Sequence, residues 1–144
     1  MPDKIAWESS KHWESSDGLE KFLLEEDDIV LAMDRPWITS GFKIAQIQRS
    51  DLPALLIQRT AWIRGKSVNQ TFLLWMFNSP NFRLHCKVTE TTVPHISIGD
   101  IRWYEIFLPP LDLQTRFAEF VLRADKSKFE LQRTLDELEA VYIC

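Results

Sequence analysis

Two groups of residues have types and spacing close to those of known chemical motifs. Gly65-Lys66-Ser67 matches the end of a phosphate-binding loop, but that motif requires a glycine at position 60, where threonine stands. His85 and Cys86 are adjacent, and no second pair of ligands follows at the spacing of a metal site. The sequence therefore predicts neither a nucleotide triphosphatase nor a metal centre, and we expect no cofactor.

The other titratable residues do not form a catalytic pattern either. The three histidines do not accompany a serine or cysteine in a recognisable nucleophile motif. Asp100 and Glu105 would suit a metal-dependent nuclease only with a lysine two residues after the glutamate, where Phe107 stands. We therefore expect a protein without catalytic activity of its own.

The composition is that of one folded domain in a reducing compartment. The 144 residues are 45% hydrophobic and 12% aromatic, which excludes a disordered or collagen-like chain. Two cysteines cannot form a disulfide scaffold, and no apolar run approaches the ~20 residues of a membrane helix. Since no secretory leader opens the chain, we expect a cytoplasmic protein without membrane contact.

The charge is distributed unevenly along the chain. The net charge is −4, yet residues 35–87 carry eight lysines and arginines against one acidic residue, Asp51. The segments before and after this stretch are both acidic. A locally basic segment attracts a phosphate backbone, although a solvated surface of mixed charge would give the same counts. Charge alone leaves both interpretations open.

The pattern of apolar residues and turn signals predicts a mixed α+β fold. Short strands are predicted at Ile29–Met33, Phe42–Gln48, Leu55–Arg64 and Trp103–Leu108. Short helices are predicted from Asn69 to Asn78, after Ser79-Pro80, and from Ser97 to Asp100, each with a capping residue at its start. We expect these elements to form a small twisted sheet with short helices.

A long helix is predicted at the C-terminal end, from about Asp112 to Tyr142, where glycine and proline are absent. Its apolar residues repeat with the spacing of a coiled-coil seam, which calls for a partner helix. Packing of this helix on its own domain is the alternative. The predicted interface consists of Phe117, Val121, Ala124, Lys128, Leu131, Leu135 and Leu138.

Four stretches resemble the specificity subunits of type I restriction–modification systems. They are Glu26–Pro36, Leu55–Ala61, Pro94–Ile101 and the junction Ile106–Ala118, which contains Pro109-Pro110-Leu111 and, three residues on, Gln114. Each motif is loose, but their order along the chain is specific. The resemblance implies a target recognition domain at residues 1–110, incomplete at its N-terminus, and a conserved spacer or dimerisation helix at residues 111–144.

The resemblance also implies a function and partners. The chain would read double-stranded DNA as one half of a specificity subunit, and its helix would position the modification (methyltransferase) subunits. Because the family's second spacer helix is missing, an identical helix from another copy would replace it in a homodimer. Two alternatives remain: a docking or decoy module that binds modification subunits without reading DNA, and a coiled-coil scaffold.

The candidate DNA-contacting residues are the basic and polar side chains on the predicted turns. They lie after the first strand, after the third strand and on the polar loop before Ser97. If the first two turns share one edge of the sheet, they form a basic rim suited to backbone and base contact. The candidates are Arg35, Thr39, Ser40, Lys43, Arg64, Lys66, Thr91, Thr92 and His95.

Overall fold

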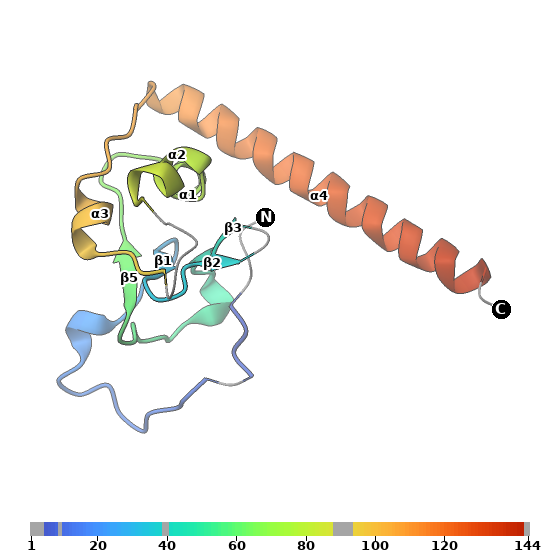
Figure 1. Cartoon of the computed structure of the whole chain (residues 1–144). Helices are drawn as coiled ribbons and strands as arrows, with labels where there is room; N and C mark the ends of the chain where they lie inside the picture. Colours follow the sequence, from blue (N-terminus) through green and yellow to red (C-terminus); the bar gives the residue numbers. More distant parts are fainter. Residues whose placement is uncertain (1–4, 9, 39–40, 88–93, 143–144) are drawn as a thin grey trace.

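A computed structural model describes residues 5–8, 10–38, 41–87 and 94–142. The elements along the chain are η1 (Glu20–Phe22), β1 (Ile29–Ala32), β2 (Trp37–Ile38), β3 (Gly41–Phe42), β4 (Ile44–Gln46), η2 (Arg49–Asp51), β5 (Thr60–Ile63), α1 (Gln70–Phe77), α2 (Pro80–His85), α3 (Ile98–Arg102) and α4 (Leu111–Tyr142). The predicted α+β class is confirmed: a small antiparallel sheet is followed by short helices and one long C-terminal helix (Figure 1).

The central sheet has the strand order β4-β1-β5, and both pairings are antiparallel. β1 alternates in burial because successive side chains of a strand point to opposite faces: Ile29 and Leu31 are fully buried, whereas Val30 is only partly covered. Ile29 and Leu31 belong to the main core, together with Phe82 and residues of α1. The prediction of a buried strand at Ile29–Met33 is confirmed apart from its last residue.

The strand predicted at Phe42–Gln48 is divided into two. Gly41 and Phe42 pair back on β2, whereas Ile44–Gln46 pair with β1. Gly41 has a φ of +133°, and a Cβ atom there would lie 2.8 Å from Oδ1 of Asn78. This same oxygen accepts a hydrogen bond from the Phe42 backbone N–H. The close approach to Asn78 explains why this hairpin requires glycine.

The strand predicted at Leu55–Arg64 is shorter in the structure. Only Thr60–Ile63 form β5, and Leu55 makes an isolated bridge with Leu23. The chain turns immediately before β5, where Arg59 has a φ of 62°. A left-handed residue interrupts the extended conformation, so the alternating pattern before it does not continue the strand.

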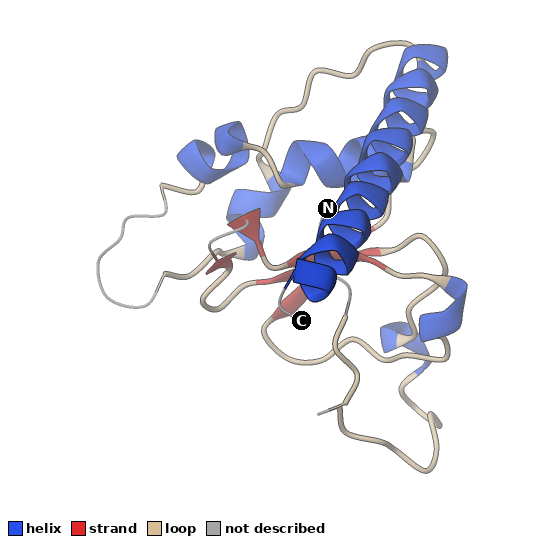
Figure 2. Ribbon diagram, turned by 90° about the vertical axis from the view of Figure 1, so that its right-hand side faces the viewer, coloured by secondary structure: helices blue, strands red, loops and turns tan. Residues whose placement is uncertain are grey.

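The three short helices follow their predicted starts. Side-chain oxygens of Asn69, Ser79 and Ser97 accept hydrogen bonds from backbone N–H groups in the first turns of α1, α2 and α3. α2 directs Phe82 into the core, where its ring contacts Phe42, Phe77 and Tyr104. In Figure 1 α1 and α2 lie between the sheet and the start of α4, and Figure 2 shows the molecule from the side toward which α4 projects.

The prediction of a strand at Trp103–Leu108 is wrong. Residues 104–110 are irregular, although Tyr104 and Ile106 pack against the main core and their neighbours are exposed. The alternating pattern therefore predicted which side chains are buried. It did not predict a strand, because within the described part of the chain no other strand pairs with this segment.

Helix α4 packs on α1 through its first three turns and then extends beyond the rest of the chain (Figure 1). Phe117 lies edge-on to Phe72 and Trp75, with ring centroids 5.7 and 6.4 Å away. Ala118 and Val121 are buried, whereas every residue from 126 to 140 is exposed. The alternative of packing on its own domain thus applies to the start of the helix.

Gln114 attaches α4 to the domain. Its Oε1 accepts a hydrogen bond of 2.9 Å from the backbone N–H of Asn69, and its Nε2 donates one of 2.7 Å to the carbonyl oxygen of Pro109. The side chain is 3% exposed. The glutamine of the junction motif therefore connects the start of α1, the proline pair and α4 at one buried point.

Replacing Gln114 with alanine is expected to destabilise the protein by about 1–3 kcal/mol, because two partly buried backbone groups lose their partner. Urea unfolding followed by circular dichroism measures this change. Gln132→Ala is the matched control, since Gln132 lies on the exposed part of α4 and its amide contacts only Asp136 among the described residues. An equal loss of stability in both variants would contradict the role of Gln114.

Candidate nucleic-acid interface

The two predicted DNA-contacting turns lie at opposite ends of the sheet. Leu31 pairs with Ile44 and Ala32 with Thr60 at one end, whereas Ile29 pairs with Ile63 at the other. Since β5 runs antiparallel to β1, Arg64 and Lys66 come out at the N-terminal end of β1. They are separated from the turn after β1 by about 10 Å of strand. The two turns therefore do not share an edge, and they do not form one basic rim.

The side chain of Arg64 is bound by carboxylates of its own domain. Its Nε and Nη2 donate to the two carboxylate oxygens of Asp28 at 2.7 and 2.8 Å, and Nη1 donates to Glu25 at 2.8 Å. Its guanidinium also lies 4.7 Å from the centre of the Trp62 ring. The hydrogen bond to Asp28 is the main cause that raises the pKa of Arg64. Because Asp28 is 1% exposed, Arg64 neutralises a buried charge, and this role accounts for Arg64 without a DNA contact.

The opposite end of the sheet gathers a different set of basic residues. We define the β1 rim as Arg35, Lys43, Arg59 and His95, which surround the C-terminal end of β1. Backbone hydrogen bonds join the three segments: the Arg35 N–H donates to Pro94, and the Met33 N–H to Arg59. Three of the four residues were predicted from the sequence.

One carboxylate connects two members of the β1 rim. Asp34 Oδ2 lies 2.8 Å from Nη1 of Arg59, and its Oδ1 lies 2.7 Å from Nδ1 of His95. The hydrogen bond from His95 is the largest cause that lowers the pKa of Asp34. Asp34 therefore stays ionised and orients an arginine and a histidine that are both exposed.

Arg59 and Arg83 were not among the DNA-contacting residues predicted from the sequence. Arg59 interrupts the apolar face of its predicted strand, and a charged residue at such a position is the signal that marks a turn. The Arg83 guanidinium lies 4.0 Å from the centre of the Trp37 ring, which in turn packs edge-on against Phe42. No local sequence signal predicts that Arg83, on α2, lies beside the hairpin that follows β1.

Four of the predicted contact residues lie outside the described part of the chain: Thr39, Ser40, Thr91 and Thr92. The described residues on either side of their two segments belong to the same region. Gly41 pairs with Ile38 in the hairpin after β1, and Pro94 accepts the Arg35 hydrogen bond.

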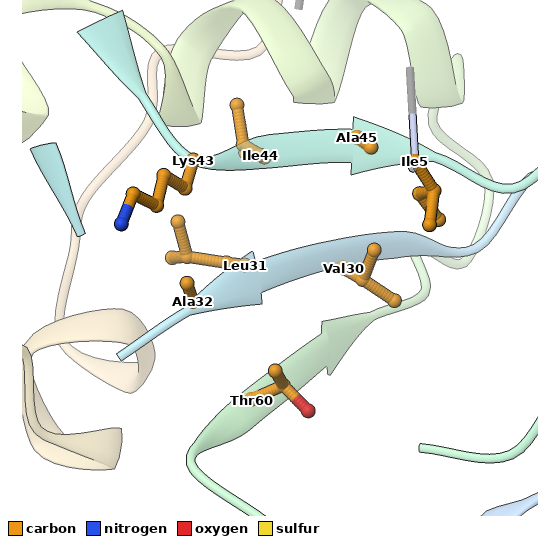
Figure 3. Close-up of a pocket in the computed structure, with 8 residues that line it drawn as sticks. All are labelled: Ile5, Val30, Leu31, Ala32, Lys43, Ile44, Ala45 and Thr60. Atoms are coloured by element: carbon orange, nitrogen blue, oxygen red, sulfur yellow. The ribbon is translucent and has the colours of Figure 1, made fainter. Parts of the chain in front are cut away.

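A shallow depression lies on the sheet beside the β1 rim. Its lining includes Val30 and Ala45, which pair across β1 and β4, and Thr60 at the start of β5. Figure 3 shows Lys43 at one end of the depression and Ile5 at the other. The other lining residues are mostly apolar. Lys43 belongs to the β1 rim, so the depression meets the rim at this residue.

The predicted helix interface is divided between two environments. Phe117 and Val121 pack on the domain, so they are already covered within one chain. The remaining members of the set are exposed on the free part of α4: Ala124, Lys128, Leu131, Leu135 and Leu138. Phe120 is also exposed and extends this apolar face toward the domain.

The described residues show no group of three histidine, cysteine or acidic side chains placed to hold a metal ion. Burial raises the pKa of the Cys86 thiol to about 12, which leaves this residue as an unreactive part of the core. In the same part of the chain, no helix has the length and apolar character needed to span a membrane.

Comparison with known proteins finds relatives in the family that the sequence motifs resemble. No family model matches the chain. The chain is 34% identical, over 125 residues and 85% of its length, to the type I restriction enzyme EcoAI specificity subunit of Escherichia coli. It is 33% identical, over 123 residues and 81% of its length, to the type I restriction enzyme MjaVIII specificity subunit of Methanocaldococcus jannaschii.

The chain is related to type I specificity subunits. The predicted resemblance is thereby confirmed. The matched region makes up 20% of the Escherichia coli protein and 29% of the Methanocaldococcus jannaschii protein. The chain thus spans less than a third of the length of these curated relatives.

Proposed function

We propose that the chain recognises double-stranded DNA as one half of a type I specificity subunit. In this proposal residues 1–110 are the target recognition domain and residues 111–144 the spacer helix. The similarity to specificity subunits over more than four-fifths of the chain carries the proposal. The β1 rim supports the proposal, because basic residues from separate segments lie together at this end of the sheet although the net charge of the protein is −4.

The β1 rim has two kinds of basic residue. Lys43 and Arg35 are exposed, and among the described residues no carboxylate contacts their side chains. Such exposed cations suit the phosphate backbone, whose contacts position a protein on DNA without reading sequence. Arg59 and His95 are the second kind, because both are held by the carboxylate of Asp34.

A second surface supports docking to a modification subunit. Trp103 and Phe107, on the segment before α4, are 79% and 86% exposed, and Leu108 beside them is exposed as well. Large apolar side chains that stay in contact with water mark protein interaction sites. We propose that this segment and α4 bind the methyltransferase subunit, which would supply the methyl-transfer chemistry of the complex. We assign the complex to the cytoplasm.

The free part of α4 supports pairing with a second copy. Leu131, Leu135 and Leu138 share one face of the helix and are each more than half exposed. Lys128 lies in the same face, so parallel helices would place two ammonium groups together. Antiparallel helices bring Lys128 close to an acidic residue of the partner, and we propose that arrangement.

Replacing Arg35 and Lys43 together with alanine is expected to weaken duplex binding and to reduce the slope of log K against log salt by about two at most. Fluorescence anisotropy with a labelled mixed-sequence duplex, between about 50 and 200 mM salt, measures the slope.

The control is the pair Arg49→Ala and Lys66→Ala, which removes the same charge from the opposite end of the sheet. We expect this control to leave the slope nearly unchanged. A wild-type protein that shows no salt-dependent binding would refute DNA recognition by the chain. Equal slopes in both double variants would move the interface away from the β1 rim.

A further inference from the structure

We propose that Arg59, oriented by Asp34, reads a guanine in the major groove and is a specificity-determining residue of the chain. This inference rests on the proposed DNA-recognition function. It names the base that is read and the residue that reads it. It divides the β1 rim into a base-reading arginine and two residues, Arg35 and Lys43, that contact phosphates.

The backbone of Arg59 is fixed to the sheet. Its carbonyl oxygen accepts a hydrogen bond of 2.9 Å from the Met33 N–H, and the next residue, Thr60, pairs with Ala32 of β1. The φ of 62° places the Arg59 side chain on a tight turn at the end of the sheet. The starting point of the side chain is therefore defined before DNA binds.

The guanidinium is also held, without being covered. Nη1 lies 2.8 Å from Asp34 Oδ2, yet the side chain is 78% exposed. Arginine has five N–H donors in a rigid plane, so one contact to Asp34 leaves enough donors for a bidentate partner. The second oxygen of Asp34 is held by His95, which limits rotation of the carboxylate. Such preorganisation reduces the ordering cost of a base contact.

The charge of Asp34 distinguishes a base from a phosphate. A phosphate beside Arg59 would also meet the ionised carboxylate and be repelled by it. The O6 and N7 atoms of guanine are neutral acceptors, and they match the two parallel donors of an arginine. No comparable carboxylate contacts Lys43 or Arg35 among the described residues, which suits these two side chains to phosphates.

The experiment selects preferred sequences from a pool of duplexes with a randomised central segment. The full chain is compared with Arg59→Ala, Arg59→Lys, Asp34→Asn and Lys43→Ala, and circular dichroism checks that each variant is folded. We expect the wild type to enrich a motif with a fixed G·C pair. Arg59→Ala should lose the preference at that pair by about 10- to 100-fold and keep it elsewhere in the motif.

The other variants distinguish the base contact of Arg59 from the effects of its charge and of its orientation by Asp34. Arg59→Lys keeps the charge but removes the bidentate geometry, so it should also lose the guanine preference. Asp34→Asn should weaken this preference and tolerate phosphate contacts better, which steepens the salt dependence. Lys43→Ala should bind more weakly to all sequences and retain the same motif.

Each alternative outcome has a defined meaning. If Arg59→Ala enriches the wild-type motif unchanged, or weakens all positions equally, Arg59 does not read a base and the inference is overturned. In both cases the proposed function stands. If the wild type enriches no sequence at all, sequence recognition by the chain fails and this inference fails with it.

Discussion

Replacing Arg64 with alanine is expected to lower the free energy of unfolding by about 3 kcal/mol, at the lower end of the range for breaking a buried ion pair. The variant leaves the buried Asp28 carboxylate with one described hydrogen-bond donor, the backbone N–H of Glu25. Because Arg64 itself is about one-third exposed, water enters part of the vacated space and moderates the loss. Equilibrium unfolding in urea measures the difference.

Arg59→Ala is the matched control for this prediction. Arg59 also pairs with an aspartate, but both side chains of that pair are accessible to water. Exposed ion pairs contribute only about 0–1 kcal/mol. If Arg64→Ala were as stable as the control, Arg64 would not be needed to neutralise Asp28, and its assignment as a DNA contact would need to be reconsidered.

Replacing Leu131 and Leu138 together with glutamate is expected to convert a dimer into monomers while the first 110 residues stay folded. Each leucine buried between helices contributes roughly 1.5–3 kcal/mol, and the variant replaces two of them with charges in every copy. Light scattering reports the mass, and circular dichroism reports the fold.

The control places the same charges on the other side of the helix. Leu122 and Phe129 are seven residues apart, exposed and apolar, and the helical period places them far from the face of Leu131 and Leu138. Leu122→Glu with Phe129→Glu should therefore remain dimeric. A wild type that is monomeric at tens of micromolar would contradict pairing with a second copy.

Features that depend on neighbouring residues were predictable from the sequence. The three short helices are capped by Asn69, Ser79 and Ser97, whose short polar side chains reach the N–H groups of the first turn. Such capping residues can be recognised from the local sequence alone. The long helix is similarly marked by its heptad spacing. The resemblance to specificity subunits followed from ordered local motifs, and the comparisons confirm it.

Features that depend on pairing between distant segments were not predictable. The composition of the Trp103–Leu108 segment resembles a strand, but a strand also needs a neighbour with free hydrogen-bonding groups. In the candidate site, the antiparallel register separates Arg64 from Arg35 and brings Arg59 to the β1 rim instead. A single sequence contains no direct record of that register.

The attachment of α4 by Gln114 has a mechanical consequence. Contacts with the domain end near Val121, and the residues from there to Tyr142 extend about 30 Å at 1.5 Å per residue. A rotation of about 10° at the last contact, near Val121, therefore moves the tip of the helix by about 5 Å, roughly one helical turn. The buried contacts from Gln114 to Val121 therefore set the direction of the free part of the helix, and a small change in this packing produces a much larger displacement at the far end.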